Sequence, residues 1–241
     1  MRSARISLVP AYLLHQMPWR DSSRILEFFT RAHGRVSLFA RGVRRERSEA
    51  RPLLQPFQRL LVSWTGRGEA GTLAGVERDG ERTVLPPNQV LSGFYLSELL
   101  LKLLARHDAH PQLFDDYAAA LQGLAAGAAP GRCLRIFEKR LLQALGLWPD
   151  CDRETSSGTP LQAERHYHFR PERGVEAAVS ETPATYQGAS LLSLAGEELC
   201  DEQSLRDARR LLRAALDACL EGRSLKSREV LTALRKQEIK L

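Results

Sequence analysis

The hydrophobic periodicity of the chain changes near residue 80, and this change limits the folds that the chain can adopt. Before it, short apolar runs alternate with turn residues, which is the pattern of β-strands. The expected strands cover residues 6–14, 23–30, 35–40, 57–65 and 71–76. Turns around Gly34 and within residues 66–71 are expected to join neighbouring strands as hairpins. Five short strands predict a small closed barrel of the OB type, with an SH3-like barrel as the alternative.

Beyond a boundary expected at residues 79–89, which include Pro86 and Pro87, apolar residues recur at helical spacing. Helices are expected over residues 88–106, 111–126, 132–145, 190–200, 204–220 and 227–236. Asn88 and Ser204 are the expected N-caps of two of them. Residues 149–187 break the helical pattern, and residues 166–179 predict a hairpin with its turn at 172–174.

The predicted fold class is therefore α+β, in two domains. Residues 1–80 are expected to form a five-stranded OB-type barrel. Residues 81–241 are expected to form a mainly helical domain, into which residues 149–187 insert a loop and a β-hairpin.

The positive charge of the chain lies in the first of these domains. Residues 1–80 hold 14 Arg and no Lys against 7 Asp and Glu, whereas residues 81–241 hold 21 Lys and Arg against 22 Asp and Glu. Such asymmetry indicates a surface for nucleic acid or another polyanion on the first domain.

Arginines concentrate in "ARGVRRERSEARP", residues 40–52, between two expected barrel strands. A basic run is by itself more often a solvated loop than a binding site. Here it sits within an OB-type barrel, and arginine pairs with phosphate in bidentate fashion. The predicted DNA contacts in this run are Arg41, Arg44, Arg45 and Arg47.

Four aromatic residues near the basic run could stack on bases: Trp19, Phe39, Phe57 and Trp64. Trp19 lies between Pro18 and Arg20 just before a turn, so it is expected to be the most exposed, whereas Phe39 and Phe57 fit the barrel core equally well. The predicted DNA surface includes Trp19, Arg24 and Arg35.

A second basic cluster lies on the helix expected over residues 204–220. Arg206, Arg210 and Arg213 follow i, i+4, i+7 spacing and are expected to share one face. This face is predicted to contact DNA, with a solvated helix face as the alternative.

Motifs of catalysis are missing from the sequence, which has no GxxxxGK[ST], GxGxxG, HExxH or GxSxG. The chain is therefore not expected to be an enzyme. Cys151, His166 and His168 are candidate metal ligands, although a polar face of the strand explains the two histidines equally simply. A metal-dependent enzyme that uses these three residues is the weaker alternative function. The four cysteines form no CxxC pair, and no apolar run approaches the ~20 residues of a membrane span, so a cytoplasmic protein with no membrane partner is expected.

Several motifs follow one another in a recognisable order. They are "AYLLHQMPWRDSSRILEFFTRAHGRVSLFARGVRR" (11–45), "LLQPF" (53–57), "GRGE" (66–69), "LRIFEKRLLQALG" (134–146) and "LKSRE" (225–229). This series, which extends along essentially the whole chain, resembles the bacterial RecO family of recombination mediators.

The resemblance implies an N-terminal OB fold, a helical C-terminal domain and no covalent catalysis. It implies binding to single- and double-stranded DNA, annealing of complementary strands, and action with RecR to help RecA displace the single-stranded-DNA-binding protein SSB at the nucleoid. An OB-containing RNA-binding or ribosome-associated factor remains the alternative.

Two further expectations follow from the resemblance. The acidic, hydrophobic-ended tail of SSB needs an apolar pocket rimmed by basic side chains, for which the predicted residues are Arg132, Arg135, Phe137 and Lys139. Many family members carry a four-cysteine zinc element after the third helix, but residues 149–187 keep only Cys151. No bound zinc is therefore expected, and the hairpin is expected to be held by packing.

Overall fold

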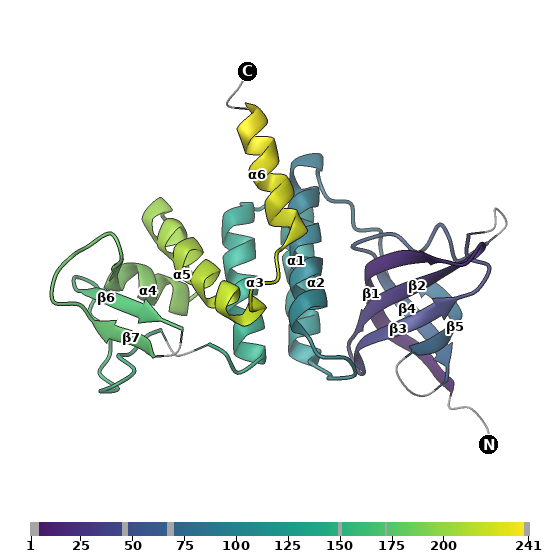
Figure 1. Cartoon of the computed structure of the whole chain (residues 1–241), viewed down its shortest axis with the longest axis horizontal. Helices are drawn as coiled ribbons and strands as arrows, with labels where there is room; N and C mark the ends of the chain where they lie inside the picture. Colours follow the sequence, from purple (N-terminus) through teal and green to yellow (C-terminus); the bar gives the residue numbers. More distant parts are fainter. Residues whose placement is uncertain (1–4, 45–47, 67–69, 149–150, 172, 239–241) are drawn as a thin grey trace. The chain divides into compact units, whose positions relative to one another are not determined.

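The N-terminal strands close into a five-stranded barrel (Figure 1). The computed structural model describes residues 5–44, 48–66, 70–148, 151–171 and 173–238, and the side chains of the last helix through Leu234. The barrel strands are β1 (Arg5–Trp19), β2 (Ser23–Thr30), β3 (Gly34–Ala40), β4 (Arg59–Thr65) and β5 (Ala70–Arg78). Their order is β1-β2-β3-β5-β4, with β1 closing on β4 and with β3 parallel to β5. This arrangement confirms the predicted OB-type barrel.

Alternate residues of the strands fill the inside of the barrel. Its core includes Leu26 and Phe28 of β2, Val36 and Leu38 of β3, and Val62 of β4. The predicted hairpin at Gly34 is present, and this residue has a φ of 63°. A Cβ there would lie 2.0 Å from the Asp108 carbonyl oxygen, so a glycine is required both by the backbone conformation and by the close approach of the loop at Asp108.

The predicted helices are all present. After a 3₁₀ turn, η1 (Pro87–Gln89), the helices are α1 (Val90–Leu103), α2 (Pro111–Ala125), α3 (Pro130–Ala144), α4 (Gly188–Ala195), α5 (Glu202–Leu220) and α6 (Lys226–Glu238). The two predicted N-caps are wrong. Asn88 lies within η1, and the N-cap of α5 is Asp201, whose Oδ1 accepts a hydrogen bond of 2.8 Å from the backbone N–H of Ser204. Ser204 therefore belongs to the first turn of α5.

The chain forms two compact units, which are residues 1–127 with 225–241, and residues 128–224. In the first unit, α2 packs against the outside of the barrel. The ring of Phe114 lies 5.2 Å from that of Tyr12 on β1 and 5.5 Å from that of Phe29 on β2, between centroids. The segment 79–89 connects the barrel to α1 and includes η1, and the contacts group α1, α2 and α6 with the barrel.

The last helix, α6, belongs to the first unit although it follows the second in sequence (Figure 1). Leu225 is buried just before it. The Glu98 carboxylate of α1 accepts hydrogen bonds from the backbone N–H groups of Lys226 and Ser227, at 2.8 and 3.0 Å, and from Ser227 Oγ at 2.6 Å. The free N–H groups at the start of α6 are thus satisfied by another helix.

The second unit contains α3, α4, α5 and a small sheet. The predicted hairpin is confirmed as β6 (His166–Arg170) and β7 (Gly174–Ala177), which pair antiparallel. A third strand, β8 (Tyr186–Gln187), pairs with the other edge of β6. Two residues are too few for a periodic signal, so the sequence did not predict β8.

Candidate nucleic-acid interface

Two loops that are distant in sequence meet at one end of the barrel. The backbone N–H of Arg44, which follows β3, donates to the carbonyl of Ser22 at 3.1 Å in the β1–β2 turn. Arg44 Nη1 also donates to the carbonyl of Arg20 at 3.2 Å. We call the three arginines of these loops, Arg20, Arg41 and Arg44, the basic end. All three are exposed.

The loop after β3 is anchored by an apolar residue between its arginines. Val43 is buried and belongs to the barrel core, and Gly42 beside it has a φ of 67°. Because Val43 points inward, Arg41 and Arg44 are held at the surface of the barrel. Arg45 and Arg47 lie outside the described residues, so their contact with DNA stays a prediction.

Trp19 is the last residue of β1 and lies beside the basic end. Its side chain is 44% exposed, whereas Phe57 and Trp64 are buried. The prediction that Trp19 is the most exposed of the four aromatic residues is therefore confirmed. Its ring packs against that of Phe39 on β3, with centroids 6.1 Å apart.

Arg24 is half-buried on the face of β2 that carries the core residues Leu26 and Phe28. Its Nη1 donates to Gln16 Oε1 at 2.5 Å, and its Nε is buried without a hydrogen-bond partner. Because this Nε is itself buried, DNA contact by Arg24 stays a prediction.

Arg35 belongs to an ionic cluster around a buried carboxylate. Glu27 lies 3.5 Å from Arg35 Nη1 and 2.9 Å from Arg106 Nη2, and it accepts a hydrogen bond from Ser37. Burial lowers the pKa of Arg35, against the opposing effect of Glu27. The cluster thus joins β2 and β3 to the loop after α1, and DNA contact by Arg35 stays a prediction.

The arginines of α5 do not share one environment. Arg206 and Arg213 are exposed and pair with Glu202 at 3.0 Å and Asp217 at 3.7 Å on the same helix. Such surface pairs contribute little and leave the guanidinium groups accessible to solvent.

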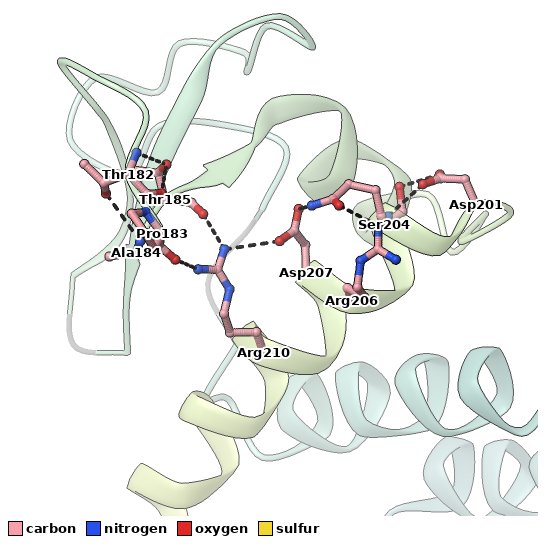
Figure 2. A network of polar contacts seen from close by, with 10 residues as sticks. Thr182, Pro183, Ala184, Thr185, Asp201, Ser204, Arg206, Asp207 and Arg210 are labelled. Carbon is pink, nitrogen blue, oxygen red and sulfur yellow. Dashed lines mark hydrogen bonds and ion pairs between the residues drawn. The ribbon is translucent and has the colours of Figure 1, made fainter.

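Arg210 instead points toward the segment Thr182–Thr185 (Figure 2). Its guanidinium donates to the carbonyls of Pro183 and Thr185, pairs with Asp207 Oδ1 at 3.1 Å, and lies 3.9 Å from the ring centroid of Tyr186. Arg210 therefore makes different contacts from Arg206 and Arg213, although its side chain is still 38% exposed. DNA contact by Arg206, Arg210 and Arg213 stays a prediction.

The residues predicted to bind the SSB tail lie on α3, and most are buried. Arg132 is exposed and donates to the carbonyls of Glu198 at 2.8 Å and Glu197 at 2.7 Å. Lys139 is buried and donates to the Ala195 carbonyl at 2.6 Å and to Glu197 Oε1 at 3.2 Å. These contacts hold α3 to the segment after α4.

The remaining two tail residues, Arg135 and Phe137, are also buried, and Arg135 pairs with Glu138. Burial acts to raise the pKa of Glu197, but hydrogen bonds and charge from Arg140 and Lys139 outweigh it and hold that pKa below its usual range. The binding of a tail peptide by Arg132, Arg135, Phe137 and Lys139 stays a prediction.

The candidate metal ligands do not form a metal site. Across the stretches that the structure describes, no group of three or more His, Cys, Asp or Glu side chains could hold a metal ion. Cys151 is buried, and His166 Nε2 lies 3.7 Å from Glu181 Oε2. The residues present therefore do not fit a zinc element. Nor does any helix in the described part have the length and apolar character to cross a bilayer.

An OB-type barrel with exposed arginines and an exposed tryptophan at one end, followed by helices, has the features of a nucleic-acid-binding protein. The family description "Recombination protein O N terminal" matches residues 5–78, and "Recombination protein O C terminal" matches residues 87–229. The chain therefore belongs to the recombination protein O (RecO) family, a family of DNA-repair proteins.

Curated relatives named "DNA repair protein RecO" agree with this assignment. The protein from Alkalilimnicola ehrlichii is 45% identical over 232 residues, which cover 95% of this chain and 92% of that protein. The protein from Methylococcus capsulatus is 41% identical over 227 residues, with 94% and 93% covered. The protein from Cupriavidus pinatubonensis is 40% identical over 233 residues, with 95% and 80% covered.

Proposed function

We propose that the chain is a DNA-binding recombination mediator that works in the cytoplasm, at the nucleoid. It binds single- and double-stranded DNA, anneals complementary strands, and acts with RecR to promote loading of RecA onto SSB-coated single strands. It does so without making or breaking covalent bonds. The observation that carries the proposal is the convergence of Arg20, Arg41 and Arg44 from two loops beside the exposed Trp19.

Annealing requires no catalytic group in this mechanism. Two DNA strands repel each other through their phosphates, and arginines that neutralise these charges release bound counterions and lower the barrier to encounter. Base pairing then supplies the driving force. The three arginines of the basic end suit this task, since their side chains are exposed and two hydrogen bonds of Arg44, to the Ser22 and Arg20 carbonyls, join the two loops.

The SSB tail is proposed to bind at α3. Arg132 is exposed and is proposed to make the first contact with the acidic tail. Binding through Arg135, Phe137 and Lys139 requires that Ala195 and Glu197 give up their present hydrogen bonds to Lys139. An acidic peptide therefore competes with Glu197 for the same cation.

The small sheet of the second unit is proposed to fold without zinc. Cys151 is the single cysteine in residues 149–187, and the described residues offer no metal-binding group there. The Thr155 N–H donates to the Val175 carbonyl and the Val175 N–H donates to Thr155 Oγ1, while Arg210 donates to the segment before β8, so polar contacts hold this region.

The salt dependence of DNA binding tests the proposal. Each phosphate contact to a single strand contributes about 0.7 to the slope of log affinity against log salt. Replacing both Arg41 and Arg44 with alanine should therefore reduce the slope by about 1.4 and weaken binding at low salt. Fluorescence anisotropy with a labelled single strand, over a series of salt concentrations, measures both quantities.

Arg78→Ala is the matched control, because Arg78 is exposed on β5 and its replacement removes the same type of charge. It should leave the slope close to that of the wild type. A double variant with an unchanged slope would show that the basic end does not bind DNA. Competition by single-stranded RNA of equal length, if stronger than by DNA, would support the RNA-binding alternative instead.

A further inference from the structure

A β-bulge in β1 decides where Trp19 points. The pairing of β1 with β2 shifts register between Leu13 and His15. Before the shift, odd-numbered residues such as Leu13 face the barrel core. After it, the odd-numbered residues His15, Met17 and Trp19 are exposed, while Leu14 is buried.

This bulge has a large effect on the barrel surface. Side chains alternate along a strand with a period of two, so a shift of one residue moves the following side chains to the other face. Without the bulge, Met17 and Trp19 would point into the barrel with Leu13. With it, their side chains are 40% and 44% exposed. Bulges commonly re-aim side chains next to functional sites.

The re-aimed residues join apolar residues of β2 and β3. Met17 lies opposite Ile25, and Ile25 lies opposite Phe39, so these three side chains share the outer face of the barrel. The Trp19 ring lies against Phe39 at an interplanar angle of 51°. We call Met17, Trp19, Ile25 and Phe39 the outer platform.

Next to the outer platform, the same face of the barrel is covered by the helical part of the unit. On β2, Glu27 and Phe29 follow Ile25 at alternate positions, and both are buried. Glu27 contacts Arg106 after α1, and Phe29 packs against Phe114 of α2. The helical part of the unit therefore covers this face near Phe29, and the face becomes accessible toward Trp19 and the basic end.

An unpaired nucleic-acid base has the chemistry that such a surface binds. It presents a flat π-face, which stacks on an aromatic ring whatever the base, while the adjacent backbone carries phosphates for arginine. The bases of a duplex have their faces stacked on one another and cannot do the same. Stacking also leaves the hydrogen-bonding edges of a base free for pairing, as annealing requires.

We infer that the outer platform stacks unpaired bases and thereby gives the basic end a preference for single strands over duplexes. This inference rests on the proposed DNA-binding function, and it adds that the unpaired bases, as well as the phosphates, are recognised. The arginines neutralise phosphates of either form of DNA, whereas Trp19 and Phe39 select the form with accessible bases.

An abasic oligonucleotide separates the two contributions, because it keeps the phosphates and lacks the bases. In anisotropy titrations, Trp19→Ala should weaken binding of a normal single strand at least about fivefold. It should change binding of an abasic strand and of a duplex by less than about twofold, and leave the salt slope unchanged. Trp19→Phe keeps a ring and should retain most of the affinity.

Phe94→Ala is the matched control, since Phe94 is 43% exposed on α1, outside the platform, and its loss should not affect DNA binding. Thermal unfolding confirms that each variant is folded. Equal weakening for normal, abasic and duplex DNA would overturn the inference. So would a Trp19→Ala variant that binds single strands like the wild type. If the Arg41 and Arg44 double variant still loses affinity in that case, the proposed function stands.

Discussion

Arg206 and Arg210 are one helical turn apart on α5, yet their guanidinium groups have different environments (Figure 2). Arg206 is exposed beside Glu202, whereas Arg210 is surrounded by two carbonyls, Asp207 and the ring of Tyr186. Identical residue types with helical spacing thus have separate roles. We assign Arg210 to the stability of the second unit.

Replacing Arg210 with methionine tests this role. The change keeps an apolar side chain but removes the charge and its hydrogen bonds, so the free energy of unfolding should fall by about 2 kcal/mol. Arg206→Met loses an i, i+4 surface pair and should cost less than about 0.5 kcal/mol. Urea unfolding followed by circular dichroism measures both.

The same titration with a chelator tests the metal-free sheet. The unfolding midpoint of the wild type should not change, because the described residues bring no set of zinc ligands together. A lower midpoint in chelator would show a structural metal.

For the arginine variants, an Arg210→Met midpoint equal to that of Arg206→Met would show that Arg210 does not hold the segment before β8.

At the residue scale, the sequence predicted the exposure of a side chain where its neighbours in sequence indicate it, but not where distant segments determine it. The exposure of Trp19 was predicted from its place between Pro18 and Arg20 before a turn, although the bulge in β1 is what directs its side chain outward. The environment of Arg210 could not be predicted, because its partners Pro183 and Thr185 are 27 and 25 residues away in sequence. Helical spacing places a side chain on a face but does not reveal which loop covers that face.

At the scale of the elements, β1 and α6 show what periodicity misses. The predicted first strand ended at residue 14, but β1 continues to Trp19. The predicted end coincides with the bulge, at which the register shifts between Leu13 and His15. This position therefore marks a change of face within the strand and not its end.

The start of α6 explains the "LKSRE" motif, which periodicity left without a role. Leu225 is buried, Lys226 and Ser227 donate to Glu98, and Arg228 donates to the Tyr95 hydroxyl at 3.3 Å. A carboxylate at a helix N-terminus also interacts favourably with the helix dipole. The motif therefore attaches the last helix to α1.

Glu98→Ala should detach the start of α6. The variant loses the acceptor of two backbone N–H groups and of one hydroxyl, and its free energy of unfolding should fall by about 1–2 kcal/mol. Ser227→Ala loses one of these bonds and should cost about 0.5–1 kcal/mol. Hydrogen exchange at Lys226 and Ser227 should become faster in Glu98→Ala. Protection equal to that of the wild type would contradict the attachment.

At the scale of the whole chain, the barrel and the helices could be predicted because each has its own hydrophobic period. The grouping of elements could not, since α6 returns to the unit of α1 and α2 through contacts across more than a hundred residues, such as Glu98 with Ser227. Arg20 and Arg44 meet because the antiparallel register of β2 and β3, with Arg24 opposite Ala40, continues into the loops beyond both strands. The basic run was predicted, but its partner loop was not.

The most direct test of the central proposal is an annealing assay, in which energy transfer between labels on two complementary strands reports how fast they pair. The wild type and Arg78→Ala should both accelerate annealing of bare strands and of strands coated with SSB. The Arg41 and Arg44 double alanine variant should anneal both more slowly, because it neutralises fewer phosphates. Annealing by the double variant at the wild-type rate would contradict the assignment of the basic end to DNA.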